Sequence, residues 1–499
     1  MSEKLTRRDF LKRAALLGAG VTGTAILNAC APTPEPTKAP APTAVPAQPT
    51  KAPEPTKAPA PTTAPAPTKA PAPTTAPTAP AVVKTPGDAF SWQRFKGEKI
   101  EALLIKNTQG DIMAQNIKEF QDLTGITVGV DQPAEQQQRQ KLAVEFASGA
   151  TSFDVVYYSF HVQKRLFGKN KWVMDVRDYL KDPTMTAPEF DWNDFSEAGK
   201  AWATEPDGRI DALPNKIDYC NLYCNKELFD AKGVALPKTY DEMVAAAQKL
   251  HDPSKNVFGF VGRGLKNANT MLWAWMLLGW DIDVIDSKLN LNTTGPEAVE
   301  CSKMYQNLMK NYAPPGVGGF NWNEAQSAFA LGQAAMWMDG VGFAAPLEDA
   351  KSSKVKGKVA YVVQPKGPKA QWAGMTGDGM GISSFSKKQG AAWYFSMWAA
   401  SKSILAKSFA AGSGSQARNS VYTNAEALKS LTVPTAWVDT VVASGKIGRA
   451  ALPIIVPVTE FRDIFGVALN NMIGGADAAT ELKKATDEFK PILEKSEKA

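Results

Sequence analysis

The chain has 499 residues, of which 44% are hydrophobic and 21% charged, and its formal net charge is +6. The first 85 residues carry this excess, so the remaining chain is close to neutral and lacks the concentrated basic face that nucleic-acid phosphates require. The chain beyond about residue 86 is long enough for two or three domain-sized units. We therefore expect a folded protein whose partner is small or uncharged.

The chain begins with the pattern of an export signal. A basic start precedes an apolar stretch from about Ala14 to Leu27, which is too short and too glycine-rich for a comfortable membrane span. Arg7 and Arg8 lie in the run Thr-Arg-Arg-Asp-Phe-Leu-Lys, and a Leu-Asn-Ala-Cys sequence ends at Cys30. Together these segments resemble a twin-arginine export signal that ends in a lipobox.

This resemblance implies that residues 1–29 are a cleaved signal peptide and that Cys30 becomes a lipidated first residue. Acyl chains, at about 0.8 kcal/mol per buried methylene, anchor a protein without a transmembrane helix. Asn28 departs from the small or aliphatic residue usual at its position, so an ordinary signal with an incidental Cys30 is the alternative. We expect a lipid-anchored protein on the outer face of the cytoplasmic membrane.

A proline-rich tether, residues 30–85, follows the signal. Residues 31–80 contain 17 of the 35 prolines and no aromatic, Leu, Ile or Met residue, so this segment cannot form a hydrophobic core. Fifty residues in mostly extended polyproline conformation reach on the order of 100 Å. A spacer explains the composition and position better than the alternative, a recognition site of the kind that SH3 domains bind.

Strand and helix patterns alternate after the tether. An apolar strand over residues 100–105 precedes a helical face of Met113, Ile117, Phe120 and Leu123, which ends at Gly125. Alternating apolar residues then predict a strand from Ile126 to Val130. A helix over residues 136–148, stopped by Gly149, leads to an apolar run over residues 153–158. Such alternation indicates a parallel α/β sheet, whose ligands lie at the carboxyl ends of strands.

Sequence motifs for catalysis are missing. The two histidines, His161 and His251, are far apart in sequence, and the exported part has no zinc-protease, serine-hydrolase, Cys-x-x-Cys or P-loop motif. We therefore expect a protein that is not an enzyme and that needs no metal and no cofactor. A pair of carboxylates that hydrolyses a glycosidic bond has no sequence motif and stays open.

Three cysteines lie beyond Cys30. If Cys220 and Cys224 share a strand, their Cα atoms are about 13 Å apart, beyond the roughly 7 Å that a disulfide tolerates. We therefore favour buried thiols over a bridge between them; whether Cys301 joins any disulfide stays open.

Aromatic residues lie in polar or strand-end contexts. They include Trp273, Trp275, Trp280, Trp322, Trp337 and Trp372. A flat ring covers the apolar face of a sugar while polar side chains satisfy its hydroxyls, although core packing is the other interpretation for each. Trp273 and Trp275 are not expected to face inward together on one helix side.

Several segments, in their order, resemble the sugar-binding family of extracellular solute-binding proteins of ABC importers. The resemblance covers about residues 97–495, with Cys224 in place of the usual Tyr and Gln416 in place of Leu-Pro before Arg418. The segments are Phe153-Asp-Val-Val-Tyr157, Trp172-Val-Met-Asp-Val176, Ala212-Leu-Pro214, Leu222-Tyr-Cys-Asn-Lys-Glu-Leu-Phe229 with Gly233, Pro237-Lys-Thr-Tyr-Asp-Glu242, Phe329-Ala-Leu-Gly-Gln-Ala-Ala-Met336, Ala391-Ala-Trp-Tyr-Phe395 and Gln416-Ala-Arg418.

The resemblance implies an α/β, two-lobed fold of the periplasmic-binding-protein type (type II), with hinge-crossing strands and a ligand cleft. From the family pattern we place the crossings near Asp218 to Leu222, Ala373 to Gly377 and Ser420. The first lobe comprises residues 97–218 plus 377–420, and the second comprises residues 219–376 plus 421–499. The implied function is reversible capture of a sugar or oligosaccharide by a monomer that delivers it to a membrane permease.

We place the candidate cleft residues mainly just after strands and in the segments where the family presents ligand contacts. Asp378, between two glycines, is the strongest candidate, because glycine lets the backbone approach a ligand and a carboxylate accepts hydroxyl donors. Arg418 is either a cleft residue or part of an ion pair between the lobes. The full candidate set is Gln109, Tyr158, His161, Asp218, Trp273, Trp322, Asp339, Phe343, Asp378 and Arg418.

Two alternatives remain beside a sugar receptor: a binding protein of the same fold for a polyol, peptide, ferric ion or other solute, and a glycan-active exoenzyme. The sequence does not identify the solute, its length, its affinity or the permease, nor whether the protein also signals.

Overall fold

The computed structural model describes residues 89–498. The predicted signal peptide, the lipidated Cys30 and the tether lie outside these residues. Among the described helices, none combines the length and apolar character needed to cross a membrane.

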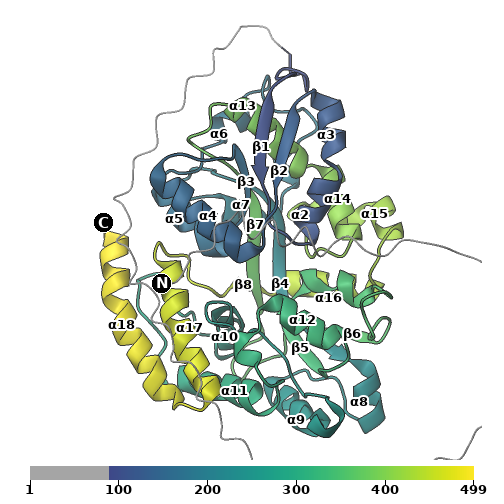
Figure 1. Ribbon diagram of the computed structural model, residues 1–499, viewed down its shortest axis with the longest axis vertical. Helices are drawn as coiled ribbons and strands as arrows, with labels where there is room; N and C mark the ends of the chain where they lie inside the picture. The colour runs from purple at the N-terminus through teal and green to yellow at the C-terminus, as the bar shows by residue number, and fades with distance from the viewer. Residues whose placement is uncertain (1–88, 499) are drawn as a thin grey trace, which may run out of the picture. The chain divides into compact units, whose positions relative to one another are not determined.

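The described strands form one eight-stranded sheet with the order β2-β1-β3-β7-β4-β5, in which β6 also pairs with β4 and β8 with β7. Figure 1 shows the long strands β4 and β7 running between two groups of helices and shorter strands. The strands are β1 (Lys99–Leu103), β2 (Thr127–Asp131), β3 (Val155–Ser159), β4 (Leu213–Asn225), β5 (Met336–Gly340), β6 (Val359–Val363), β7 (Ala373–Ile382) and β8 (Gly448–Ala450).

The first part of the sheet is parallel, as the alternating pattern predicts. Strand β1 pairs in parallel with β2 and with β3. The later strand β7 then inserts antiparallel between β3 and β4, so the whole sheet is mixed rather than purely parallel. Local sequence could not predict this step, because β7 follows β3 by more than 200 residues.

Strand β4 belongs to both halves of the molecule. Its residues 213–219 pair with β7, whereas its residues 220–225 pair with β5 and β6. The buried hydrophobic residues form two clusters: one spans both halves, and the other lies almost wholly in the second half. The result is a two-lobed α/β fold joined by crossing strands; the lobe boundaries given above remain predictions, and Ser420 lies in a short 3-10 helix (Asn419–Thr423).

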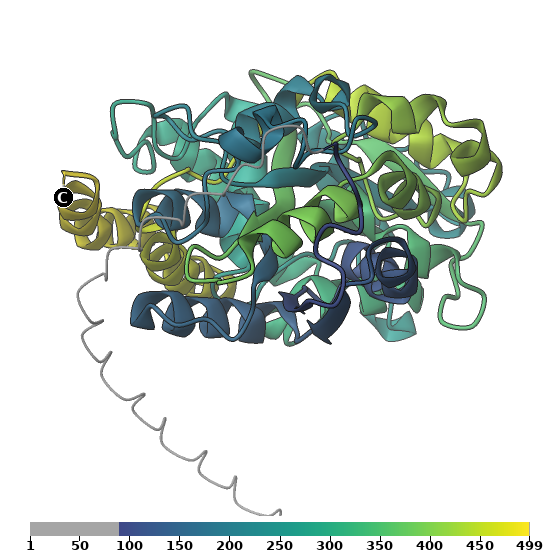
Figure 2. The same cartoon turned by 90° about the horizontal axis from the view of Figure 1, so that it is seen from above.

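Helices cover the sheet on both sides, as Figure 2 shows from above. Those of the first lobe are α2 (Thr108–Gln115), α3 (Ile117–Thr124), α4 (Glu135–Ser148), α5 (Phe160–Lys169), α6 (Arg177–Lys181), α7 (Glu197–Ala203), α13 (Gln389–Ala399) and α14 (Lys402–Ala410). The others are α8 (Lys226–Lys232), α9 (Tyr240–Leu250), α10 (Asn269–Leu277), α11 (Pro296–Asn311), α12 (Trp322–Ala330), α15 (Ala425–Lys429), α16 (Thr435–Gly445), α17 (Val458–Gly474) and α18 (Ala478–Lys498).

The first predicted helix is two helices. The chain leaves helical geometry at Asn116 (φ −103°, ψ 9°), whose side-chain amide donates to the carbonyl of Ile112 at 2.7 Å. Asparagine favours such breaks because its side chain competes for backbone hydrogen bonds. Gly125 ends α3 and Gly149 ends α4 in the left-handed conformation, with φ values of 70° and 73°, which confirms both predicted stops.

Cys220, Cys224 and Cys301 are buried free thiols. Cys220 and Cys224 both lie on β4, as the sequence argument assumed. Burial raises the pKa of each of the three thiols.

Candidate functional site

A cavity of about 280 Å³ lies where the two lobes meet around β4 and β7. Its volume is at the lower end of the range for small-molecule sites, roughly 300–1,000 Å³. It is lined by Ile105, Lys106, Asn107, Thr108, Gln109, Asp111, Glu135, Ser159, His161, Lys216, Asp218, Arg263, Met271, Trp275, Trp322, Gln326, Gly340, Gly342, Phe343, Pro346, Thr376 and Asp378. Both lobes therefore contribute side chains to one enclosure.

Asp378 lies on β7, opposite Ser159 of β3 and Lys216 of β4. Its side chain is 9% exposed, and its Oδ1 atom has no hydrogen-bond partner within the described part of the chain. Burial raises the pKa of Asp378 to about 6, although Lys216 and then Ser159 act to lower it. Asp378 is thus a buried acceptor available to a bound molecule.

The glycines beside Asp378 serve a purpose other than the predicted one. A Cβ atom on Gly379 would lie 2.3 Å from the ring of Phe160 and 2.4 Å from the carbonyl oxygen of Leu213. A Cβ on Gly377 would lie 3.2 Å from Trp202. Glycine at these positions therefore makes room for protein packing, in place of the close approach of a ligand that we expected.

Lys216 and Asp218 form a buried ion pair on β4. The Lys216 Nζ atom lies 2.9 Å from Asp218 Oδ2, and the backbone N–H of Gly342 donates to Asp218 Oδ1 at 3.0 Å. Burial raises the pKa of Asp218, although Lys216 acts to lower it. A Cβ at Gly342 would lie 2.7 Å from the backbone carbonyl oxygen of Ser413, so this close approach of two chain segments requires glycine.

Arg263 enters the cavity from the segment before α10. Its side chain donates two hydrogen bonds to Asp339: Nε donates to Oδ2 at 2.9 Å, and Nη2 donates to Oδ1. Its guanidinium also lies 5.6 Å from the ring centre of Trp275 and 5.7 Å from that of Phe343. Asp339 is fully buried outside the lining, so it positions Arg263 and does not face the cavity itself.

Aromatic side chains form part of the wall. Trp322 of α12 stacks on Phe343, with ring centres 4.9 Å apart and planes 14° apart. Trp275 of α10 is buried, and its Nε1 has no hydrogen-bond partner among the described residues. The wall thus combines apolar surface with an unused indole donor.

The first lobe contributes Gln109, at the start of α2, and His161, after β3. Gln109 accepts a hydrogen bond from Ser413 Oγ at 2.9 Å, and its Nε2 is left without a partner among residues 89–498. His161 Nδ1 lies 3.3 Å from the carbonyl oxygen of Gly377. Burial, together with Arg139 and Arg462, lowers the pKa of His161 to about 3, so its imidazole is neutral at physiological pH.

The structure brings part of the candidate set together in this cavity: Gln109, His161, Asp218, Trp322, Phe343 and Asp378. Tyr158, Trp273, Asp339 and Arg418 are not among the lining residues.

Strand geometry explains the position of Tyr158. Successive side chains of a strand point to opposite faces, so Tyr158 faces away from the side of Ser159, which lines the cavity. Asp211 and Glu205, which lie outside the cavity lining, are the charges that act on its hydroxyl.

Trp273 is part of the second core. It stacks on Phe465 at 5.7 Å, and its Nε1 donates to Ser302 Oγ at 2.8 Å. Every residue of α10 is buried, so the helix is enclosed on all sides. Trp273 and Trp275 are both buried but have different neighbours, since Trp275 lies against Arg263, in agreement with our expectation that they do not face inward together on one helix side.

Arg418 is fully buried within the first lobe. It donates to the backbone carbonyls of Ala400 and Phe190, each at 2.6 Å, and pairs with Asp194 at 3.2 Å. These partners all lie within residues 97–218 and 377–420, so Arg418 is neither a cleft residue nor a bridge between the lobes.

Sequence reasoning missed Glu135, Ser159, Lys216, Arg263 and Trp275. Trp275 and Arg263 had visible signals: the first is in the same aromatic segment as Trp273, and the second is flanked by Gly262 and Gly264. Lys216 and Glu135 carried none, because charged residues of this kind are usually on the surface.

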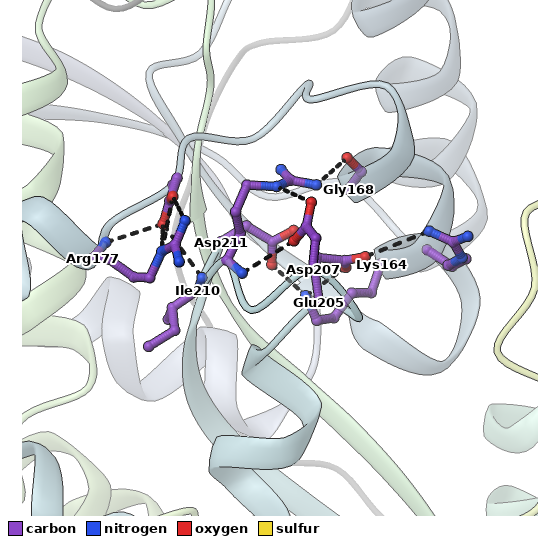
Figure 3. A network of polar contacts seen from close by, with 10 residues as sticks. Lys164, Gly168, Arg177, Glu205, Asp207, Ile210 and Asp211 are labelled. Carbon is purple, nitrogen blue, oxygen red and sulfur yellow. Dashed lines mark hydrogen bonds and ion pairs between the residues drawn. The ribbon is translucent and has the colours of Figure 1, made fainter.

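A second buried polar network lies in the first lobe outside the cavity (Figure 3). The Lys164 Nζ atom lies 2.8 Å from Glu205 Oε1 and also pairs with Asp211. Burial raises the pKa of Asp211, although Lys164 acts to lower it. Because Lys164 compensates two buried carboxylates, we assign this network to stability.

The cavity presents fixed donors and acceptors from several elements, which suits reversible capture of a molecule rich in hydroxyl groups. Across residues 89–498, no group of three or more His, Cys, Asp or Glu side chains is placed to hold a metal ion.

Several known proteins are similar to this chain in sequence and in fold. The sequence model described as bacterial extracellular solute-binding protein matches residues 106–404. A probable amino-acid ABC transporter periplasmic-binding protein of Sinorhizobium fredii is 25% identical over 347 residues, which cover 67% of this chain and 76% of that protein. An erythritol/L-threitol-binding protein of Mycolicibacterium smegmatis is 25% identical over 419 residues, which cover 79% of this chain and 86% of that protein.

Among solved structures, an ABC transporter solute-binding protein of Agrobacterium radiobacter in complex with ribitol is similar with a TM-score of 0.73 and 26% identity. The match covers 80% of this chain and 99% of that one.

Proposed function

We infer that this chain, which belongs to the family of bacterial extracellular solute-binding proteins, captures a small acyclic polyol in the cavity between its lobes. The family works outside the cytoplasm with ABC transporters, so the captured solute is delivered to a permease. The observation that carries the proposal is a small cavity whose lining includes Gln109, Trp275 and Asp378, each of which has a buried polar atom without a hydrogen-bond partner among residues 89–498.

The chemistry of these atoms supports a polyhydroxylated solute. Asp378 accepts hydrogen bonds, whereas the side-chain N–H groups of Gln109 and Trp275 donate them. A hydroxyl group does both, so a chain of hydroxyls satisfies all three without a net charge on the solute. Leaving these buried atoms unpaired costs roughly 1–3 kcal/mol each, which is the free energy that a polyol recovers on binding.

Part of the aromatic wall packs against the protein itself. Phe343 covers one face of Trp322, Arg263 lies over Trp275, and Lys216 lies 5.7 Å from the ring centre of Phe343. Since each ring has two faces, these contacts do not distinguish a polyol from a sugar, and the choice of a polyol rests on the unpartnered polar atoms and the cavity volume.

Two relatives support the same class of solute, because one is named as an erythritol/L-threitol-binding protein and another holds ribitol. The cavity of about 280 Å³ suits four to six carbons better than an oligosaccharide. We also propose that residues 1–29 direct export by the twin-arginine route and that lipidated Cys30 anchors the protein to the membrane.

A thermal-shift panel with the full chain tests the proposed solute. Ribitol, erythritol, mannitol, maltotriose and amino acids are each added in excess, since a ligand at a hundred times its Kd adds about 2.7 kcal/mol of stability. We expect a shift with at least one polyol and none with maltotriose. A shift confined to amino acids or to oligosaccharides would overturn the polyol assignment, and consumption of the solute would indicate an enzyme.

A further inference from the structure

Helix α4 of the first lobe begins in the cavity with Glu135, which reaches the second lobe. Its Oε2 atom accepts a hydrogen bond from Nε1 of Trp322 in α12 at 3.2 Å. Its other oxygen pairs with Arg139, one turn further along α4. Glu135 is therefore fixed by its own helix while it contacts the opposite side of the cleft.

The second lobe presents positive charge to this carboxylate. Arg263 lines the cavity beside Glu135, and Arg462 of α17 acts on it from further away. Burial acts to raise the pKa of Glu135, but Arg139, Arg263 and Arg462 outweigh burial and lower the pKa to about 2. Glu135 is thus charged at every physiological pH.

Arg462 of α17 is a buried cation without a close carboxylate among the described residues. It is 3% exposed, and across residues 89–498 it forms no ion pair within 4.0 Å. Its Nε donates to the backbone carbonyl of Asn267 at 3.1 Å. Burial and Arg139 of the first lobe act against its charge, and Glu135 of the first lobe and then its neighbour Asp463 act in favour of it. Separation of the lobes would remove the effects of both Arg139 and Glu135, and because Arg139 opposes Arg462 more strongly than Glu135 supports it, Arg462 itself does not favour closure.

We propose that Glu135 is a latch between the lobes, which favours the closed cleft through its hydrogen bond from Trp322 and its attraction to Arg263. The groups that face Glu135 are Arg139, Arg263, Arg462 and the neutral His161. These contacts are made by side chains of the protein itself, so they shift the balance between the open and closed forms toward closure, and a solute that touches both lobes adds to this shift.

A latch regulates solute exchange only if the cavity receives a solute, so this inference rests on the proposed function. Its test does not depend on the identity of that solute. Loss of one charge-assisted hydrogen bond and the accompanying ion pairs should change the ratio of closed to open molecules about tenfold.

The test is a distance measurement across the cleft in the ligand-free full chain. Nitroxide labels at Lys118→Cys in α3 and Lys483→Cys in α18, in a Cys30→Ser background, report the separation of the lobes by double electron–electron resonance. Both lysine side chains are well exposed, and the native thiols at 220, 224 and 301 are buried. Glu135→Gln removes the charge, and Trp322→Phe removes the indole donor from the other side. Glu197→Gln, at an exposed position of α7, is the matched control.

We expect a short distance to dominate in the wild type and in Glu197→Gln, and a longer one to grow about tenfold in Glu135→Gln and in Trp322→Phe. Identical distributions in the wild type and both cleft variants would overturn the latch. If Glu135→Gln opens and no polyol closes it again, the latch stands and the polyol assignment fails. If Glu135→Gln does not fold, Trp322→Phe alone decides.

Discussion

We expect solute binding to depend on the protonation state of Asp378. It accepts hydroxyl donors as a carboxylate, and burial raises its pKa to about 6, with Lys216 acting in the opposite direction. We expect affinity for ribitol to be full above this pH and to fall as the pH drops through 6, because the protonated acid loses acceptor strength. Asp378→Asn should weaken binding roughly 10–100-fold at pH 8 and leave little pH dependence, as measured by calorimetry. Equal affinity of the variant and the wild type at pH 8 would exclude Asp378 as a contact.

The same shift in pKa makes a prediction for stability. The folded-state pKa of Asp378 lies above its unfolded value of about 3.8, so the folded protein holds this proton more tightly. Stability from this group is therefore fully present at low pH and is lost as the pH rises from about 4 through 6. The slope should be smaller in Asp378→Asn but not absent, because burial also raises the pKa of Asp211, to about 7, and that of Asp218. Urea unfolding at several pH values measures it, and an unchanged slope would show that Asp378 does not contribute.

Lys164 compensates two buried carboxylates in the first lobe (Figure 3). Lys164→Met leaves Glu205 and Asp211 without their buried cation, and we expect a loss of about 3 kcal/mol in the free energy of unfolding at pH 7.5. The loss should be smaller at pH 5, because burial raises the pKa of Asp211 to about 7 and its carboxyl takes up a proton there. Lys118→Met, at an exposed ion pair with Asp122, is the control and should cost less than about 0.5 kcal/mol. A loss as small as that of the control would mean that the network is not needed for stability.

At this scale six of the ten candidate residues line the cavity, and three of the other four lie one or two positions from a residue that does. The sequence placed a tyrosine and a tryptophan near the cleft, but it selected Tyr158 and Trp273, whereas the cavity is lined by Ser159 and Trp275. An error of one or two positions along an element moves a side chain to another face, and without a precise boundary the sequence does not resolve it. Buried charges such as Lys216 have no sequence signal, because their partners come from the fold.

Strand β7 positions the indole of Trp275 through a glycine. A Cβ at Gly374 would lie 1.8 Å from Cδ1 of Trp275, so Gly374→Ala must displace the ring. We expect a stability loss of about 1–3 kcal/mol and weaker ribitol binding, measured by thermal unfolding with and without ribitol. Gly295→Ala, where the added atom meets nothing within 4 Å, is the control. Undiminished ribitol binding by Gly374→Ala would argue against a role for Trp275 in the site.

Helices and strands whose limits are marked by apolar periodicity and terminal glycines could be predicted from the sequence. The sequence predicted β1, β2, β3 and α4 within a few residues, because apolar periodicity and terminal glycines mark their limits. The break between α2 and α3 was missed, since the apolar face continues across Asn116. The antiparallel insertion of β7 was also missed, because it depends on a partner distant in sequence.

For the whole molecule, the order of the family-like segments implied a two-lobed fold that the structure and its likeness to solved structures confirm. Local physical chemistry alone gave only an α/β protein with a strand-end site. The solute class could not be predicted from the sequence, because cavity volume and the pairing of buried polar atoms depend on the packing of both lobes. We expected a sugar or oligosaccharide from the sequence, with a polyol among the alternatives, and the cavity volume is the reason that we propose a polyol.

The central claim is that the cavity between the lobes takes up a small polyol. Calorimetric titration of the full chain with ribitol tests it most directly, with maltotriose as the larger competitor. Our account predicts saturable binding of one ribitol per chain, with no heat from maltotriose and no competition by it. Saturable binding of maltotriose, with none of ribitol, would contradict it.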